Sequence, residues 1–181
     1  MADRLDEVLD AAYACLELYG ARRTTMDDIA RRAGMSRSAV YQYVRNKDDA
    51  FRRLAERLHE QALGAAAGAA SRPGAAPRER VRGVLAAKLA LLPPGGSPHT
   101  AELLDERARL FGGICEGFTA RLRALLIDIF TTAGLPAPAD AADVCLALAR
   151  GFEAAPGTAR LLPQAVEALL EGYSHTEGVP L

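Results

Sequence analysis

The segment Thr24–Lys47 contains two short helical patterns on either side of the turn Gly34-Met35-Ser36. Glycine adopts the left-handed backbone that such a turn needs without a steric penalty, and serine is a favoured N-cap. A small residue, Ala30, lets a second helix cross closely over the first. Two short helices joined by a turn of three or four residues form a helix-turn-helix. We therefore predict helices over about 26–33 and 37–44, above a small core that is formed by Ile29, Ala33, Met35 and Val40.

Helical periodicity continues through the rest of the 181 residues, and no segment shows convincing strand alternation. Gly20 is expected to end the first helix, and Asn46 to cap a long one. The predicted fold is all-α, with a DNA-binding domain over 1–46, a linking helix over 47–70 and a ligand-binding and dimerisation domain over 47–181. We expect further helices over about 5–20, 78–92, 100–111, from Gly112-Gly113 to about 132, 140–154 and 163–174.

The charge distribution is uneven, although the net charge is only −1. Residues 21–47 hold seven basic and two acidic side chains, a local excess typical of a nucleic-acid footprint or of a solvated face. No apolar run is long enough to span a bilayer, and the N-terminus has no apolar signal region. The three cysteines are widely separated and show no metal-ligand spacing. We expect a cytoplasmic protein without metal or cofactor.

The second short helix presents side chains that suit DNA. Free backbone N–H groups at its N-terminus, near Ser36 and Ser38, can meet phosphate or base edges. Gln42 can pair with adenine and Arg37 with guanine, and tyrosine hydroxyls donate well to phosphate. Alternatively, Gly-Met-Ser is an ordinary connector and one of the two tyrosines lies in the core.

Residues 5–58 resemble the DNA-binding domain of the tetracycline-repressor (TetR) family. The resemblance rests on Tyr19-Gly20, the run TTMDDIA from Thr24, AGMS from Ala33, AVYQYV from Ala39 and NKDDAF from Asn46. It implies an all-helical homodimer that binds double-stranded DNA at a palindromic operator. It also implies a repressor that an unidentified small-molecule effector releases from its operator.

The same resemblance assigns roles to individual residues. It places Arg37, Ser38 and Gln42 toward bases, and it places Tyr41, Tyr43, Lys47 and the start of the 26–33 helix toward phosphates. Two residues depart from the family pattern: Ala39 stands where threonine is common, and Val44 stands where phenylalanine is usual. The candidate DNA-binding residues are Thr25, Met26, Ser36, Arg37, Ser38, Ala39, Tyr41, Gln42, Tyr43 and Lys47.

The C-terminal two thirds contain no recognisable motif. Apolar stripes on the last two helices exceed the obvious needs of one protomer, and the resemblance implies that these helices pair across a two-fold axis; alternatively, they close the protomer's own core. Candidate interface residues are Leu146, Phe152, Val166, Leu169, Leu170 and Tyr173. Apolar and aromatic residues at helical spacing are more often core than pocket, and the candidate effector residues of this kind are Leu89, Leu92, Phe111, Ile114, Cys115 and Phe118. Gly112-Gly113 is a candidate hinge.

Two other functional classes are alternatives for a helical chain of this kind. A helical enzyme is disfavoured because the chain has no H-E-x-x-H, G-x-S-x-G, P-loop or dinucleotide fingerprint. Cys115 with His99 is the only conceivable nucleophile pair, and their spacing fixes no geometry. A DNA-binding protein without a sensor remains the second alternative. We predict that the chain is not an enzyme.

Overall fold

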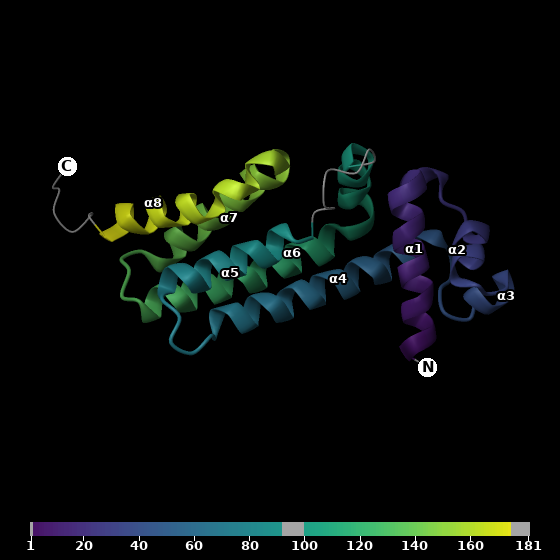
Figure 1. Cartoon of the computed structure of the whole chain (residues 1–181), viewed down its shortest axis with the longest axis horizontal. Helices are drawn as coiled ribbons and strands as arrows, with labels where there is room; N and C mark the ends of the chain where they lie inside the picture. Colours follow the sequence, from purple (N-terminus) through teal and green to yellow (C-terminus); the bar gives the residue numbers. More distant parts are fainter. Residues whose placement is uncertain (1, 92–99, 175–181) are drawn as a thin grey trace. The chain divides into compact units, whose positions relative to one another are not determined.

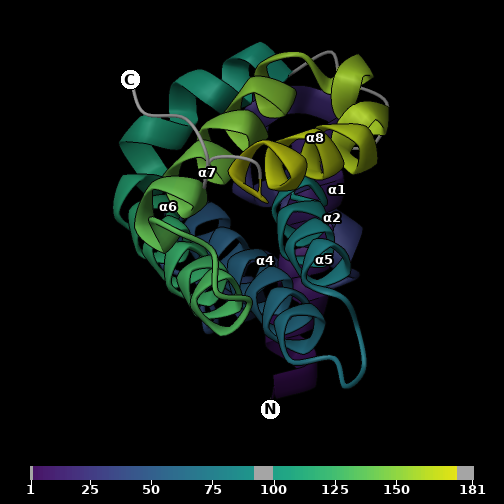
Figure 2. The ribbon, with the colours of Figure 1, turned by 90° about the vertical axis from the view of Figure 1, so that its left-hand side faces the viewer.

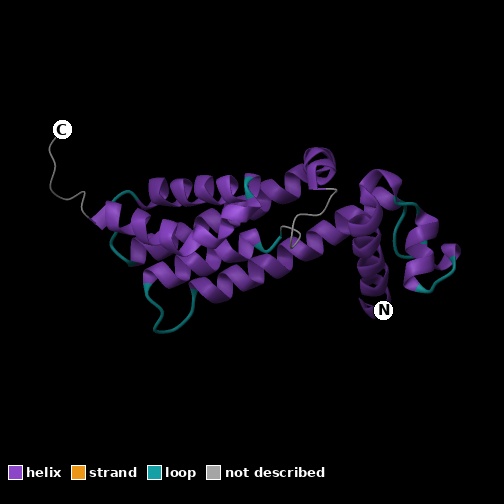
Figure 3. Ribbon diagram, turned by 45° about the horizontal axis from the view of Figure 1, so that its top comes forward, coloured by secondary structure: helices purple, strands orange, loops and turns teal. Residues whose placement is uncertain are grey.

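The computed structural model describes residues 2–91 and 100–174, and all regular elements in these ranges are helical (Figure 3). The described chain divides into two compact units: residues 2–59 with 100–115, and residues 60–91 with 116–174. The first unit extends beyond the predicted boundary at residue 46 because the next helix supplies Phe51 and Leu54 to its core. Within these ranges no helix is both long and apolar enough to cross a membrane.

The first unit consists of α1 (Ala2–Arg23), α2 (Met26–Ala33), α3 (Arg37–Val40), the first half of α4 (Lys47–Ala70) and the start of α6 (Thr100–Thr132). In Figure 1, α2 and α3 follow α1 in the purple end of the ribbon, and α2 packs against both α1 and α3. Ile29 and Val40 are fully buried, with Ala33 and Met35 packed at the edge of the same core. The predicted small core is confirmed.

The junction between α1 and α2 is closed by Thr24. Gly20 breaks the regular helix with a φ of 76°, as predicted, and a further turn carries the chain to Arg23. The buried Thr24 hydroxyl donates to the carbonyl oxygens of Gly20, at 2.7 Å, and Cys15, at 3.2 Å. The N–H of Thr24 also donates to the Gly20 carbonyl, at 3.3 Å, so Thr24 bonds to the end of α1 through both its backbone and its side chain.

Caps define both ends of α2. The Thr25 hydroxyl accepts the N–H of Asp28 at 3.2 Å, and the Asp28 carboxylate accepts the N–H of Thr25 at 3.0 Å, which completes a capping box. Hydrogen bonds from the hydroxyl and N–H of Thr25 hold the pKa of Asp28 below its ordinary value. At the other end Gly34 has a φ of 66°, and the N–H groups of Gly34 and Met35 bond back to Arg31 and Ala30. This left-handed cap directs the chain into α3.

Helix α3 is shorter than predicted. Regular α-helix ends at Val40, after which Gln42 and Tyr43 bond to the carbonyls three residues before them, at 3.1 and 3.0 Å. This tightening is common in the last turn of a helix. It brings Val44 into the core beside Val40, so that both valines are buried.

A buried carboxylate organises the start of α4. Asn46 caps the helix, as predicted, by accepting the N–H of Asp49 at 2.8 Å. Asp49 in turn accepts the N–H of Arg45 at 2.9 Å and the guanidinium groups of Arg52 at 2.7 Å and Arg53 at 3.2 Å. Burial alone would raise the pKa of Asp49, but these bonds to its charged form outweigh burial and lower it.

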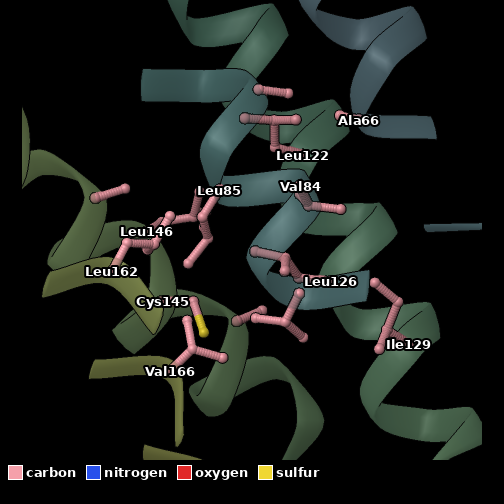
Figure 4. Close-up of a cluster of buried hydrophobic side chains, with 14 of the residues drawn as sticks. Ala66, Val84, Leu85, Leu122, Leu126, Ile129, Cys145, Leu146, Leu162 and Val166 are labelled. Atoms are coloured by element: carbon pink, nitrogen blue, oxygen red, sulfur yellow. The ribbon is translucent and has the colours of Figure 1, made fainter. Parts of the chain in front are cut away.

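The second unit contains the second half of α4, α5 (Pro77–Leu89), the rest of α6, α7 (Pro138–Ala154), the 3₁₀ segment η1 (Pro156–Leu161) and α8 (Leu162–Ser174). Helix α5 packs against α7 and α8, as Figure 2 shows. Figure 4 shows Leu85, Cys145, Leu146, Leu162 and Val166 gathered between these three helices. The unit therefore has its own apolar core.

The predicted break at Gly112-Gly113 is wrong, because α6 runs without interruption from Thr100 to Thr132. Neither glycine has a positive φ. Each costs a helix interior only about 1 kcal/mol relative to alanine, which the flanking helical turns offset. The hinge proposed for this pair stays a prediction.

Removal of the Asp49 charge tests this account of the first unit. The substitution Asp49→Asn should lower the free energy of unfolding of the first unit at pH 7 by about 1.5–3 kcal/mol. This is the range for hydrogen bonds to charged groups. Because the folded-state pKa of Asp49 is lowered, its stabilisation is present above the unfolded pKa of about 3.9 and is lost as the pH falls through the folded value. Denaturant titrations at pH 7, 5 and 3 should therefore show a smaller acid loss in Asp49→Asn than in wild type.

The matched control is Glu7→Gln, which removes an exposed ion pair with Arg4 in the same unit. We expect it to change stability by less than about 1 kcal/mol. An Asp49→Asn protein as stable as this control at pH 7 would contradict the proposed role of the carboxylate.

Candidate nucleic-acid interface

Residues 36–44 form the α3 segment, which includes α3 and the turn that follows it. One face of this segment is anchored in the core and the other faces solvent. Val40 and Val44 are buried, whereas Ser36, Arg37, Ser38 and Gln42 are exposed. Tyr41 retains 42% exposure, a high value for a large apolar ring. The exposed face thus combines hydroxyl, amide, phenol and guanidinium groups within two turns of chain.

The two tyrosines have different environments. Tyr43 is half-buried and packs against the core of the first unit, whereas Tyr41 is exposed. The alternative that one tyrosine is a core residue therefore applies to the ring of Tyr43. The phenolic hydroxyl of Tyr41 stays on the surface, where it can meet phosphate.

Arg37 is held along this surface by two neighbours. Its Nη1 atom lies 3.2 Å from Oδ1 of Asp27, and its Nη2 atom donates to the Tyr41 hydroxyl at 3.3 Å. The guanidinium carbon lies 5.6 Å from the centre of the Tyr41 ring, within cation–π range. The hydrogen bond to Tyr41 and the nearby Asp27 charge raise the pKa of Arg37. To contact a guanine, Arg37 would have to break its ion pair with Asp27 and bind the edge of the base instead.

Other predicted residues take part in local structure. Thr25 is the N-cap of α2, and Ser36 accepts the N–H of Ala39 at 3.2 Å, so both hydroxyls have capping roles. The Met26 side chain is buried, so only its backbone can face a phosphate. Ala39 is half-buried, and Lys47 donates to the Arg22 carbonyl oxygen at 3.2 Å. Lys47 thus joins the end of α1 to the start of α4.

The surroundings of this face are strongly basic. Five arginines of the first unit are exposed near the α2 and α3 segments in sequence: Arg22, Arg23, Arg31, Arg32 and Arg45. Arg31 lies 3.6 Å from Asp28, a separation that gives only weak neutralisation on an exposed surface. Positive potential from such side chains attracts the phosphate backbone without regard to sequence.

The predicted effector residues fall into both units. Phe118 is buried in the core of the second unit and Leu89 packs at the edge of that core, in agreement with the ordinary-core alternative for these two. Phe111 packs against the core of the first unit, and Ile114 and Cys115 are half-buried. Leu92 lies outside the described residues. A single cavity lined by all six stays a prediction.

The predicted dimer residues separate into two groups. Leu146, Phe152 and Val166 are buried within one protomer, which fits the alternative of an intraprotomer core. Their place at a dimer interface stays a prediction. Leu169, Leu170 and Tyr173 are only partly buried at the edge of that core.

Three charged residues escaped the sequence interpretation. Asp27 restrains Arg37, Asp49 organises α4, and Lys88 forms a buried ion pair with Glu153 at 2.7 Å. The only available signals were an acid within a basic segment and a lysine within an apolar helical stripe. His99 lies outside the described residues. Among those that are described, no three His, Cys, Asp or Glu side chains gather as metal ligands.

Comparison with known proteins identifies the first unit more closely. Residues 8–54 match the family model for bacterial regulatory proteins of the tetR family, whereas no curated protein matches the sequence. The fold is similar to that of a TetR transcription regulator from Haloarcula marismortui, with a TM-score of 0.75, 19% identity and coverage of 96% of this chain and 99% of that one.

Two further structures share the fold. The fatty acid degradation regulator FadR from Bacillus halodurans has a TM-score of 0.70 and 14% identity, with coverage of 93% of this chain and 95% of that one. The ketosteroid transcriptional regulator KstR2 of Mycobacterium tuberculosis has a TM-score of 0.64 and 19% identity, with coverage of 93% and 94%. Both similarities extend over nearly the whole chain.

Asp27→Asn tests the restraint on Arg37. Removal of this negative charge from a surface expected to face phosphates should strengthen binding to unrelated double-stranded DNA by about 1 kcal/mol, or roughly fivefold. The gain should shrink as salt rises. Fluorescence-anisotropy titrations at two salt concentrations measure it. Asp143→Asn, which removes an exposed carboxylate paired with Arg123 in the second unit, is the matched control. Equal affinities for the two variants would contradict this role of Asp27.

Proposed function

We propose that this chain, a DNA-binding transcriptional regulator of the TetR family and not an enzyme, is a repressor that binds a palindromic operator as a homodimer and is released by a small-molecule effector. The observation that carries the proposal is the exposed face of the α3 segment, where Arg37, Tyr41 and Gln42 stand above buried Val40 and Val44. Its site of action is the cytoplasm.

Some residues on this face read bases, and others contact phosphates and so position the protein on the DNA. Arg37, Ser38 and Gln42 read base edges in the major groove, with Ala39 against a thymine methyl group. Tyr41, Tyr43, Lys47, Ser36 and the start of α2 at Thr25 and Met26 contact phosphates and set the orientation. The cap at Gly34 supports this division, because it fixes the direction in which α3 leaves α2.

Dimerisation is assigned to α7 and α8. Leu169, Leu170 and Tyr173 remain partly exposed on α8, and two large apolar side chains of the second unit, Val144 and Leu161, are 46% and 39% exposed. Apolar side chains left in water favour a partner that covers them. A two-fold dimer places two α3 segments, one from each protomer, on one operator.

The effector binds among apolar side chains of the helical chain. The candidates remain Leu89, Leu92, Phe111, Ile114, Cys115 and Phe118. A small ligand that binds only the folded protein raises its melting temperature, so thermal shift with metabolite pools separates a sensor from a DNA-binding protein that lacks one. No stabilisation by any pool would favour the protein without a sensor.

Specificity and positioning should respond differently to substitution. Gln42→Ala should cost about 1–3 kcal/mol at the preferred sequence and relax the preference at one base pair. Lys47→Ala should weaken binding to all sequences about equally and reduce the salt slope by about 1. Sequence selection and salt titration of both variants measure these effects. An unchanged preference in Gln42→Ala would remove Gln42 from the base-reading set.

The dimer surface is tested by added charge. Val144→Glu and the double variant Leu169→Glu, Leu170→Glu should dissociate the dimer, because an unpaired buried charge costs several kcal/mol. Val144 is exposed in the protomer, so its substitution leaves the protomer core intact. Analytical ultracentrifugation with circular dichroism measures assembly and folding. Arg82→Glu with Ala86→Glu, on exposed positions of α5, is the control that should stay dimeric. Folded dimers of Val144→Glu and the leucine variant would move the interface elsewhere.

A further inference from the structure

A thiol and an imidazole meet within the first unit. The Sγ atom of Cys115, on α6, lies 3.6 Å from Nε2 of His59, on α4, and both residues are half-buried. From the sequence, His99 was the only conceivable partner of this thiol, with no geometry to support it. His99 lies outside the described residues, and the structure places His59, 56 residues away in the chain, beside Cys115. The pair has no part in the DNA-binding face described above.

A third group orients the imidazole. Nδ1 of His59 lies 2.7 Å from the carbonyl oxygen of Ala55, which can only accept a hydrogen bond. Nδ1 therefore carries the hydrogen, and Nε2 of the neutral ring presents a lone pair toward Cys115. A nucleophile, a base within hydrogen-bond reach and a group that orients the base are the components of an activated nucleophile.

The other two cysteines differ sharply from this one. Cys15 and Cys145 are 1% and 0% exposed. Burial raises the pKa of Cys15, and it raises the pKa of Cys145 to about 12. Buried thiols of this kind are inert, whereas a partly exposed thiol beside histidine is more reactive. All three cysteines are free of disulfides.

Residues that neighbour the pair in sequence indicate the kind of reagent. Leu58, next to His59, and Phe111, one turn before Cys115, are apolar residues at the edge of the core. Residues four apart lie on the same side of a helix, so Phe111 and Cys115 share one side of α6. Two ligands are too few for a tetrahedral metal site, and no third is grouped with them in the described residues. An apolar carbon electrophile suits this setting better than a metal ion.

We propose that Cys115 and His59 form a modification site for small apolar electrophiles that carry a carbon–carbon double bond conjugated to a carbonyl. Sγ attacks the β-carbon, and a C–S bond forms as the π bond breaks. The thiol proton moves to Nε2 of His59 and is returned to the α-carbon. The net reaction adds S–H across the double bond, without an oxidant or reductant.

The location connects the site with regulation, an inference that rests on the proposed function. His59 lies on α4, the helix that begins with Lys47 directly after the α3 segment. His59, Cys115 and the α3 segment all belong to the first unit. An adduct at Cys115 therefore changes packing within that unit. The reactivity itself does not depend on DNA binding and is measured without DNA.

The experiment treats the full chain with 2-cyclohexen-1-one at pH 7 and follows the adduct by intact-protein mass spectrometry and peptide mapping. We expect one adduct, at Cys115, that forms about tenfold or more faster in wild type than in His59→Gln, in keeping with assistance by a positioned base. Cys15 and Cys145 should remain unmodified while the protein is folded, and Cys115→Ala should gain no adduct.

Glu56→Gln, an exposed change on the same helix, is the matched control and should react like wild type. Circular dichroism establishes whether His59→Gln folds. If it does not, the wild-type rate is compared with that of glutathione, and a several-fold faster reaction of Cys115 is expected. Equal rates for wild type and folded His59→Gln, a wild-type rate no higher than that of glutathione, or preferential labelling of Cys15 or Cys145 would overturn the proposal. Because DNA is absent, failure here leaves the repressor proposal standing.

Discussion

The burial of Val40 and Val44 determines which face of the α3 segment remains in water. Both side chains enter the core of the first unit, so Arg37, Tyr41 and Gln42 are left on the surface. The left-handed cap at Gly34 fixes the start of this segment, and the carboxylate of Asp49 fixes the chain that follows it. The two buried valines, the Gly34 cap and the Asp49 carboxylate therefore position one exposed surface. Their energies are individually modest, but together they fix the position of the surface on which the proposed base contacts depend.

Much of this arrangement could be predicted because its causes are local in sequence. Gly20, Thr25, Gly34, Ser36 and Asn46 act on residues within a few positions, through caps and turn geometry. The length of α3 could not be predicted, since its last turn tightens to bury Val44. The continuity of α6 was also missed, because glycine weakens a helix without necessarily ending it.

The remaining features depend on contacts between distant residues. Asp27 meets Arg37 across the turn, Lys88 meets Glu153, and His59 meets Cys115, at sequence separations that periodicity does not address. Burial likewise assigned Leu146, Phe152 and Val166 to one protomer, although their stripe alone suited a partner equally well. A single sequence shows which faces are apolar, whereas the fold decides what covers them.

The most direct test of the account is selection of bound sequences from random double-stranded DNA by the full chain. If two α3 segments related by a two-fold axis bind together, the enriched sequence should be an inverted repeat. Its half-sites should lie about 34–36 Å apart, or a multiple of that spacing. Affinity for the enriched sequence should also fall steeply with salt, because phosphate neutralisation releases counterions. Enrichment of a lone half-site, or no enriched sequence from a folded protein, would contradict the account.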